Sequence, residues 1–258
     1  MFSTILTKST DDIGLITLNR PEALNAMDMT MRNEIRLALE NYAVEDQIRV
    51  VVITGSGRAF CAGGDVKDQA VGFDAMEGRE RVLAINRLLM TMVRLEKPII
   101  CSVNGIAFGA GFNLALSGDL IIASENAQFS QVFSRIGLVP DFGGMYILPR
   151  LLGLQKAKEM IFTGDTIGAN EAKEIGLISR VVPREDLESA TFELARRIAQ
   201  GSLTATRLAK SILNRSLDCD LPTILEMEAD AQAICLQSSE HRQLLANFLS
   251  RSESSSPI

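Results

Sequence analysis

The pattern of apolar residues changes once along this chain, near residue 182, and that change limits its fold more than any other feature. Up to that point, short β-rich runs alternate with stretches whose apolar residues recur every three or four positions. From residue 183 onward only the helical pattern remains. The sequence therefore predicts an α/β core over 1–182 and a helical region over 183–258. No linker rich in Pro, Gly or Ser separates them, so we treat both as parts of one fold.

The periodicity also places the individual elements. Strands are expected at 5–9, 14–19, 49–55, 98–104, 120–124 and 177–182. Core helices are expected around 29–46, 82–95, 143–152 and 154–163, and later helices at 188–200, 203–217, 222–237 and 241–250. Everything after the last strand is thus expected to be helical.

Charge and hydropathy exclude several classes of protein. The 32 acidic residues outnumber the 26 basic ones and give a net charge of −6, which disfavours an extended phosphate-binding surface. Nucleic acid is therefore not an expected partner. No run of about 18 apolar residues is present, and the N-terminal segment lacks the apolar core of a secretory signal. We expect a cytoplasmic protein that does not enter membranes.

The scarcity of histidine and the spacing of cysteine limit the chemistry. The single histidine, His241, lies in a helical pattern near the C-terminus, where a solvated surface position is the simpler interpretation. A histidine-based nucleophilic triad is hard to build from it, and histidine metal clusters are excluded. The four cysteines form no CxxC pair and no zinc-ligand spacing, so no metal site is predicted.

Two glycine-rich stretches are the strongest candidates for chemistry. The first, GSGRAFCAGGD at 55–65, directly follows an apolar strand, and loops at strand ends are favoured ligand sites. The second, SVNGIAFGAGFNLALSGD at 102–119, runs from a strand into a helix that begins near Ala110. The N-terminus of a helix offers unpaired N–H groups and partial positive charge, which suit a developing oxyanion. Tight packing alone also explains such glycines, and neither stretch matches a nucleotide-binding motif.

Six segments spread along the chain form a specific series. They are RPEALNAMD at 20–28, FCAGGDVK at 60–67, KPIICSVNGIAFGAGFNLAL at 97–116, DLIIASENAQFSQ at 119–131, GLVPDFGG at 137–144 and TGDTIGANEAKEIGLISRVV at 163–182. In order and spacing the series resembles the crotonase family, also called the enoyl-CoA hydratase/isomerase family. The resemblance implies a spiral core of repeated ββα units with an acyl-CoA site over 1–182, and a helical trimerisation region over 183–258. It further implies a homotrimer or a dimer of trimers, coenzyme A thioesters as substrates, and no separate cofactor.

The family's oxyanion hole consists of two backbone amides, one in the AGxD loop and one in the second glycine-rich loop. By motif, these fall on Gly64 and Ala110 in this chain. Both would donate hydrogen bonds to the thioester oxygen. They would thereby stabilise the enolate that forms when a proton leaves the adjacent carbon.

The sequence departs from the family's hydratases at both carboxylates that hold and activate water. The two glutamates of the hydratases correspond here to Asn113 and Phe133. An amide cannot take a proton from water, and a phenyl ring can neither bind nor deprotonate it. The resemblance therefore does not extend to ordinary two-carboxylate hydration.

Asp141, in GLVPDFGG, occupies a position where the hydratases commonly have glycine. This stretch resembles the corresponding stretch of the ring-opening isomerases of aerobic phenylacetate degradation, which have aspartate at the position of Asp141. One carboxylate suffices to move a proton from C2 of a 3-enoyl thioester to C4. A Pro-Asp pair before a helix is also a common helix N-cap, so a capping role stays open. Four phenylalanines would raise the pKa of the carboxyl if they line the site, namely Phe108, Phe129, Phe133 and Phe142.

Two nucleophilic alternatives are weaker. The family's dehalogenases keep a nucleophilic aspartate at the place of Asp141, but they also use a histidine and a tryptophan, and this chain has no Trp. Cys61 lies in the AGGD loop at a position that small residues often fill, so a small buried side chain is the simpler interpretation.

The family's CoA-binding segments correspond to parts of the first two landmarks. The matching residues are Ala23, Leu24, Ala62, Asp65, Val66 and Lys67. Lys67 would lie near a phosphate, although a solvated surface lysine is an equally good interpretation.

These residues favour an acyl-CoA isomerase that acts on 3-enoyl or ring-derived enoyl-CoA esters, in fatty-acid or phenylacetate breakdown, with Asp141 as the base. Two alternatives remain. One is a hydratase that uses Asp141 alone, and the other is a non-catalytic subunit that binds acyl-CoA without turnover.

Overall fold

One large, mostly parallel sheet forms the base of the fold in the computed structural model, which describes residues 2–65 and 72–254. Its strand order is β1-β2-β3-β5-β7-β10, and only the β1–β2 pair is antiparallel. The strands are β1 Ile5–Thr10, β2 Ile13–Leu18, β3 Val50–Gly55, β5 Ile99–Val103, β7 Leu120–Ser124 and β10 Arg180–Val182. All six predicted strands therefore belong to one sheet.

A second, smaller sheet alternates with the first along the chain. It consists of β4 Ala59–Cys61, β6 Ile106–Phe108, β8 Gln128–Ser130 and β9 Thr166–Gly168, in that order. The chain forms a strand of the large sheet, then a strand of the small one, then a helix, as in β5, β6 and α4 Ala110–Leu116. The next unit is β7, β8 and, after the 3-10 turn η2 Val132–Ile136, α5 Gly144–Thr163. These repeated ββα units confirm the predicted α/β spiral.

Glycine forms the corner at which the chain passes from one sheet to the other. A Cβ at Gly55 would lie 2.2 Å from the carbonyl oxygen of Ala59, and one at Gly105 would lie 2.0 Å from that of Arg58. No side chain fits at such distances. The turns from β3 into β4 and from β5 into β6 therefore require glycine.

The large sheet is buried on both faces. On β3, Val51 and Ile53 belong to the main core, while Val50 and Val52 belong to a second cluster covered by α7 Leu187–Ala199. Successive side chains of a strand point to opposite faces, so a strand covered on both sides is apolar throughout. The main core also includes α1 Met29–Val44 and α3 Ala75–Arg94, which pack against each other.

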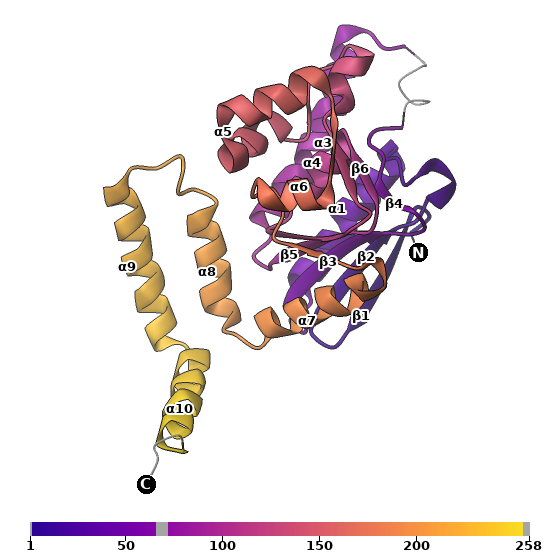
Figure 1. The fold of residues 1–258 in the computed structure, drawn as a ribbon. Helices are drawn as coiled ribbons and strands as arrows, with labels where there is room; N and C mark the ends of the chain where they lie inside the picture. The colour runs from indigo at the N-terminus through magenta and orange to yellow at the C-terminus, as the bar shows by residue number, and fades with distance from the viewer. Residues whose placement is uncertain (1, 66–71, 255–258) are drawn as a thin grey trace.

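The last helices extend away from the two sheets (Figure 1). They are α8 Leu203–Leu213, α9 Leu221–Gln237 and α10 Ser239–Ser254. Lys210 fastens α8 to the core, because its Nζ lies 2.7 Å from Asp119 Oδ2 and 3.1 Å from the carbonyl oxygen of Lys97. Exposed apolar side chains on α9 and α10 include Leu225, Ile234, Leu236, Leu245 and Phe248. The oligomerisation role of 183–258 remains a prediction.

Several elements differ from their predicted bounds. The helix expected from residue 82 begins at Ala75, because Asp74 and Glu77 form a reciprocal capping box there. The helices expected at 143–152 and 154–163 form one element, α5, interrupted by Gly153 in a non-helical conformation. The strands of the small sheet were not expected, because three residues are too few for a periodicity to show. No described helix has the length and hydropathy needed to cross a membrane.

Candidate active site

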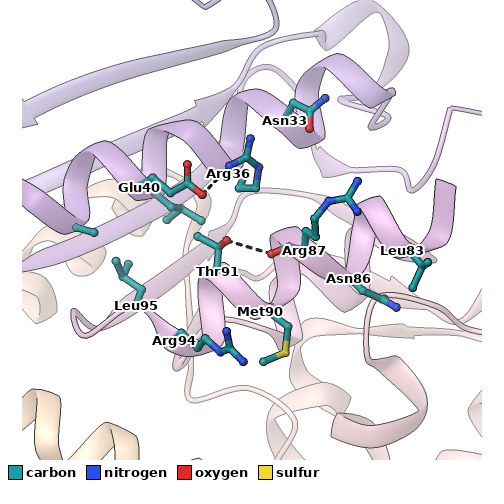
Figure 2. A pocket seen from close by; sticks show the side chains of 12 residues that line it. Asn33, Arg36, Glu40, Leu83, Asn86, Arg87, Met90, Thr91, Arg94 and Leu95 are labelled. Atoms are coloured by element: carbon teal, nitrogen blue, oxygen red, sulfur yellow. Dashed lines mark hydrogen bonds and ion pairs between the residues drawn. The ribbon is translucent and has the colours of Figure 1, made fainter. Parts of the chain in front are cut away.

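Of the hollows that border α3, two have linings that offer different chemistry. The first, between α1 and α3, holds Arg87 and Arg94 on α3 and the pair of Arg36 with Glu40 on α1, 2.6 Å apart (Figure 2). It borders neither glycine-rich stretch. The second, with a volume of about 840 Å³, is lined by both glycine-rich stretches and by Asp141. The second hollow is therefore the candidate active site.

The two glycine-rich stretches meet at one point of this cavity wall. A Cβ on Gly63, whose φ is +115°, would lie 3.7 Å from the nitrogen of Ala110. Met27 holds the first stretch: its N–H donates to the Gly63 carbonyl at 2.8 Å, and its own carbonyl accepts from the N–H of Asp65 at 3.2 Å. The loop after β4 is thus fixed against the start of α4.

The amides of Gly64 and Ala110 both border the cavity. Gly64 lies between the two bonds to Met27, and its own N–H donates to no group in the described part of the chain. Ala110 is the first residue of α4, so its N–H has no acceptor within the helix. Two such donors beside one cavity would suit a thioester oxygen. Their role as an oxyanion hole remains a prediction.

Asp141 lies on the loop between η2 and α5 and borders the same cavity. Its Oδ1 is buried and has no hydrogen-bond partner among the described residues. Burial raises the pKa of this carboxyl above its usual range, although the charge of Arg32 and the N–H of Asp141 itself oppose the shift. The helix α5 starts after Gly143 without a side-chain cap bond, so the capping alternative for Asp141 is wrong. A desolvated carboxylate with one oxygen free of hydrogen bonds is a suitable general base.

The two residues at the positions of the hydratase glutamates are both buried, at or next to the cavity wall. Asn113, on α4, is fully buried, and its Nδ2 donates to the backbone carbonyl of Asp141 at 2.8 Å. Phe133 is buried in the cavity wall. Neither position supplies a carboxylate to the cavity.

The expected cage of phenylalanines around the carboxylate is only half present. Phe133 and Phe142 line the cavity. Phe129 lies instead in the core, where its ring centroid is 5.3 Å from that of Phe112, and Phe108 is not among the bordering residues. Most of the remaining lining is aliphatic and includes Val82, Leu89, Met90, Val132, Ile136, Leu138, Val139 and Met145.

Arg32 is a site residue that sequence reasoning missed. It lies on α1, is nearly fully buried, lines the cavity and lowers the pKa of Asp141 through its charge. A signal was present in the sequence, because Arg32 precedes Ile35 by three positions and Leu39 by seven, on the buried face of the helix. Arginine on such a face is rarely buried without a pairing or a functional role.

Part of the predicted CoA-binding set lies along the 3-10 turn η1 Pro21–Ala23. Ala23 ends this turn, and Leu24 follows in a left-handed conformation with φ of 51°. The carbonyl of Leu24 accepts a hydrogen bond from the N–H of Ala62 at 3.0 Å. Ala62 in turn borders the cavity, which joins the turn to the candidate active site.

The rest of that set is only partly described. Asp65 pairs with Arg20 at 3.0 Å, and Arg20 also pairs with Asp28 at 3.2 Å, so this loop is fixed by charge. Val66 and Lys67 lie outside the described residues. CoA binding by all six residues remains a prediction.

Other nucleophiles and metal sites find no support in this cavity. Cys61 is fully buried, and burial raises the pKa of its thiol to about 12, so it is a packed thiol rather than a thiolate. His241 lies on α10 and does not border the cavity. Within the described ranges, no group of His, Cys, Asp and Glu is arranged to hold a metal ion.

Comparison with known proteins places these features in context. Residues 8–255 match the protein family described as Enoyl-CoA hydratase/isomerase. The chain is 36% identical to the 1,2-epoxyphenylacetyl-CoA isomerase of Escherichia coli (strain K12), over 97% of each protein. It is 34% identical to the short-chain-enoyl-CoA hydratase of Clostridium acetobutylicum, over 93% of this chain and 92% of that protein. The crystal structure of an enoyl-CoA hydratase from Bacillus anthracis superimposes with a TM-score of 0.93 at 35% identity, covering 96% of this chain and 97% of the other.

Proposed function

The chain belongs to the enoyl-CoA hydratase/isomerase family, and we propose that it is an isomerase that shifts the double bond of 3-enoyl or ring-derived enoyl-CoA esters. The observation that carries this proposal is the carboxylate of Asp141, which borders the same cavity as the amides of Gly64 and Ala110 and is joined by no second carboxylate among the described lining residues. The similarity to an isomerase of a ring epoxide supports ring-derived substrates.

The proposed reaction needs one proton carrier and one oxyanion site. The carboxylate of Asp141 takes the proton from C2, the C2–H electron pair moves into the thioester, and the oxygen becomes an oxyanion. The N–H groups of Gly64 and Ala110 donate to that oxygen and stabilise the dienolate. The carboxyl of Asp141 then returns the proton to C4, which leaves the double bond between C2 and C3. Electrons and protons balance without any cofactor beyond the CoA of the substrate.

The environment of Asp141 suits a base of this kind. Its raised pKa makes the ionised carboxylate a stronger proton acceptor than a solvated aspartate. The charge of Arg32 opposes this shift, because a nearby cation favours the ionised form of the carboxyl.

Hydration is less well supported by the same residues. It requires a water molecule that is held and deprotonated, and Asn113 and Phe133 provide no carboxylate for that task. Relatives of this chain include proteins named as hydratases, so hydration is the alternative outcome of the test below.

The test follows deuterium in D₂O. Purified protein is incubated with a 3-enoyl-CoA and, separately, with a 2-enoyl-CoA, and products are identified by mass spectrometry and NMR. We expect the 2-enoyl ester from the first substrate, with deuterium at C4 to the extent that the Asp141 carboxyl exchanges its proton with solvent before returning it, and no 3-hydroxy product from either. Rapid formation of 3-hydroxyacyl-CoA would refute the isomerase proposal. Tight binding of both esters without any turnover or exchange would identify a non-catalytic binding subunit instead.

We also propose that CoA lies along η1 and the first glycine-rich loop, over Ala23, Leu24, Ala62, Asp65, Val66 and Lys67. Copies of the chain would assemble as a homotrimer or a dimer of trimers through α8, α9 and α10. The exposed apolar side chains of α9 and α10 support such an assembly. Native mass spectrometry would test it, and a monomeric mass at micromolar concentration would refute it.

A further inference from the structure

The loop that carries Asp141 has an unfavourable backbone conformation. Phe142 and Gly143 are both left-handed, with φ of 49° and 73°. Phenylalanine rarely adopts this conformation, so other contacts must hold the loop. One contact is local: the N–H of Gly144 donates to the carbonyl of Asp141 at 3.0 Å.

A second contact comes from α4. The side chain of Asn113 donates from Nδ2 to the same carbonyl of Asp141, at 2.8 Å. A Cβ on Gly144 would lie 2.4 Å from this Nδ2, so the amide fits against the loop only because residue 144 is glycine. The base is thus tied to α4 through its own backbone.

Asn113 is in turn oriented by a second buried amide. Gln131 Nε2 donates to Asn113 Oδ1 at 2.7 Å, and neither side chain is exposed to solvent. Gln131 Oε1 is also buried and has no partner among the described residues, so Gln131 contributes here through its donor alone. Donors therefore run in one direction, from Gln131 to Asn113 to the carbonyl of Asp141.

We propose that Asn113 and Gln131 are positioning residues whose amide chain fixes the carboxylate of Asp141 relative to the amide of Ala110. Asn113 lies three residues after Ala110, within one turn of the same helix. One rigid element therefore places both the oxyanion donor and the loop of the base. The inference rests on the proposed function in one respect, namely that Asp141 is the base.

The decisive variant is Asn113→Asp, which keeps the shape and still accepts from Gln131. When neutral, its carboxyl can donate to the carbonyl of Asp141; when ionised, it cannot donate and repels that oxygen. Misplacing a reacting group by about 1 Å can cost about 100-fold, so we expect kcat to fall about 100-fold at pH 8. We expect KM to change by less than about threefold, and the ratio of variant to wild-type kcat to recover as pH falls.

A second variant removes the donor at the far end of the chain. Gln131→Met keeps the length of the side chain and should lower kcat by about tenfold with little change in KM, because Asn113 loses its orientation. The matched control is Ser117→Ala, at the residue that follows α4, which removes a buried hydrogen bond of 2.7 Å to the backbone carbonyl of Asn113. It should leave kcat and its pH dependence unchanged. Wild-type kinetics in Asn113→Asp, or an equal loss in Ser117→Ala, would overturn the proposal.

A measurement without turnover separates this proposal from the proposed function. The carboxyl of Asp141 is titrated by infrared difference spectroscopy with ¹³C-labelled aspartate, using Asp141→Asn to assign the band. We expect Asn113→Asp and Gln131→Met to shift or broaden the band, and Ser117→Ala to leave it unchanged. A band unmoved by the first two variants would overturn the positioning role, even if the wild-type protein proves to be a hydratase. Failure of isomerisation with a shifted band would refute only the reaction.

Discussion

The direction of the Ala110 N–H depends on a single glycine, and replacing that glycine tests the oxyanion hole. Gly109 has φ of 52° and ψ of −124°, a combination that only glycine adopts readily. Its ψ sets the plane of the next peptide and therefore the direction of the Ala110 N–H. The perturbation is Gly109→Ala.

The added methyl group leaves the backbone two choices. If the conformation is kept, the strain costs about 1–3 kcal/mol of stability. If residue 109 relaxes to the left-handed region, ψ changes from −124° to about +47°, a rotation of about 170°. That rotation turns the Ala110 N–H away and breaks the bond from the Asn113 N–H to the Gly109 carbonyl, now 3.0 Å long. Loss of one oxyanion donor costs about 3 kcal/mol, so kcat should fall by about 100-fold or more as the relaxed form is populated.

The assay compares kcat for isomerisation with the urea midpoint of unfolding, at one protein concentration. Gly153→Ala is the matched control, because Gly153, with φ of 73° and ψ of 165°, also has a conformation open mainly to glycine but does not border the cavity. Both variants should lose about 1–3 kcal/mol of stability, and only Gly109→Ala should lose kcat. A crystal structure of Gly109→Ala would show whether the peptide between residues 109 and 110 has rotated. If it has rotated and the variant still has the wild-type kcat, the Ala110 amide is not an oxyanion donor.

Four further predictions concern three side chains, namely Asp141, Lys210 and Cys61. The carboxyl of Asp141 must be ionised to act as base, so kcat/KM should rise as pH passes through its raised pKa. If the same rise in the pH profile survives in Asp141→Asn, it belongs to another group. That pKa is higher in the folded state than in the unfolded state, so the neutral carboxyl stabilises the fold below the unfolded pKa. The contribution is lost as pH rises through the folded pKa, and Asp141→Asn should abolish the loss in urea titrations. Lys210→Met removes the cation beside Asp119, which keeps only the N–H of Ile99, and the donor to the carbonyl of Lys97, so it should cost about 3 kcal/mol by urea unfolding. A cost below about 1 kcal/mol would mean that the pair behaves as a surface ion pair. Iodoacetamide should leave Cys61 unmodified in the folded protein at pH 8, as peptide mass spectrometry would show, because the pKa of its thiol is about 12.

The predictable part of the fold is the part with a long periodicity. The strand at 49–55 and the helix from residue 29 were predicted nearly to the residue. The strand is buried on both faces and is therefore apolar along its length, whereas the helix buries one face and repeats its apolar residues over several turns. The three-residue strands of the small sheet are too short for an alternation of apolar residues to repeat, and they were missed. Their positions depend instead on corner glycines such as Gly55 and Gly105, whose need for close approach is visible only in three dimensions.

The sequence predicted three residues that border the candidate site but not what surrounds them, and the roles of these residues as amide donors and base remain predictions. Gly64, Ala110 and Asp141 border one cavity, and this follows from motifs that survive in the linear sequence. Arg32 was missed because a helical charge is usually solvated, and its burial depends on how α1 packs. The sequence also predicted too many phenylalanines around Asp141. Phe129 is near the site in sequence, but its strand directs its side chain into the core.

The replacement of glutamate by Asn113 illustrates how one position can change its role without changing its place. A glutamate here would present a charge to the cavity, whereas the shorter amide turns to the backbone of Asp141 and to Gln131. The same helix position then supports the base instead of supplying one, because an amide can donate and accept at once. Under the proposed function, the absence of a carboxylate at position 113 and the positioning of Asp141 would both be consequences of one side chain. A chain with this asparagine gains little from regaining the second glutamate, since Phe133→Glu alone would bury a carboxylate without the partner that shares its water.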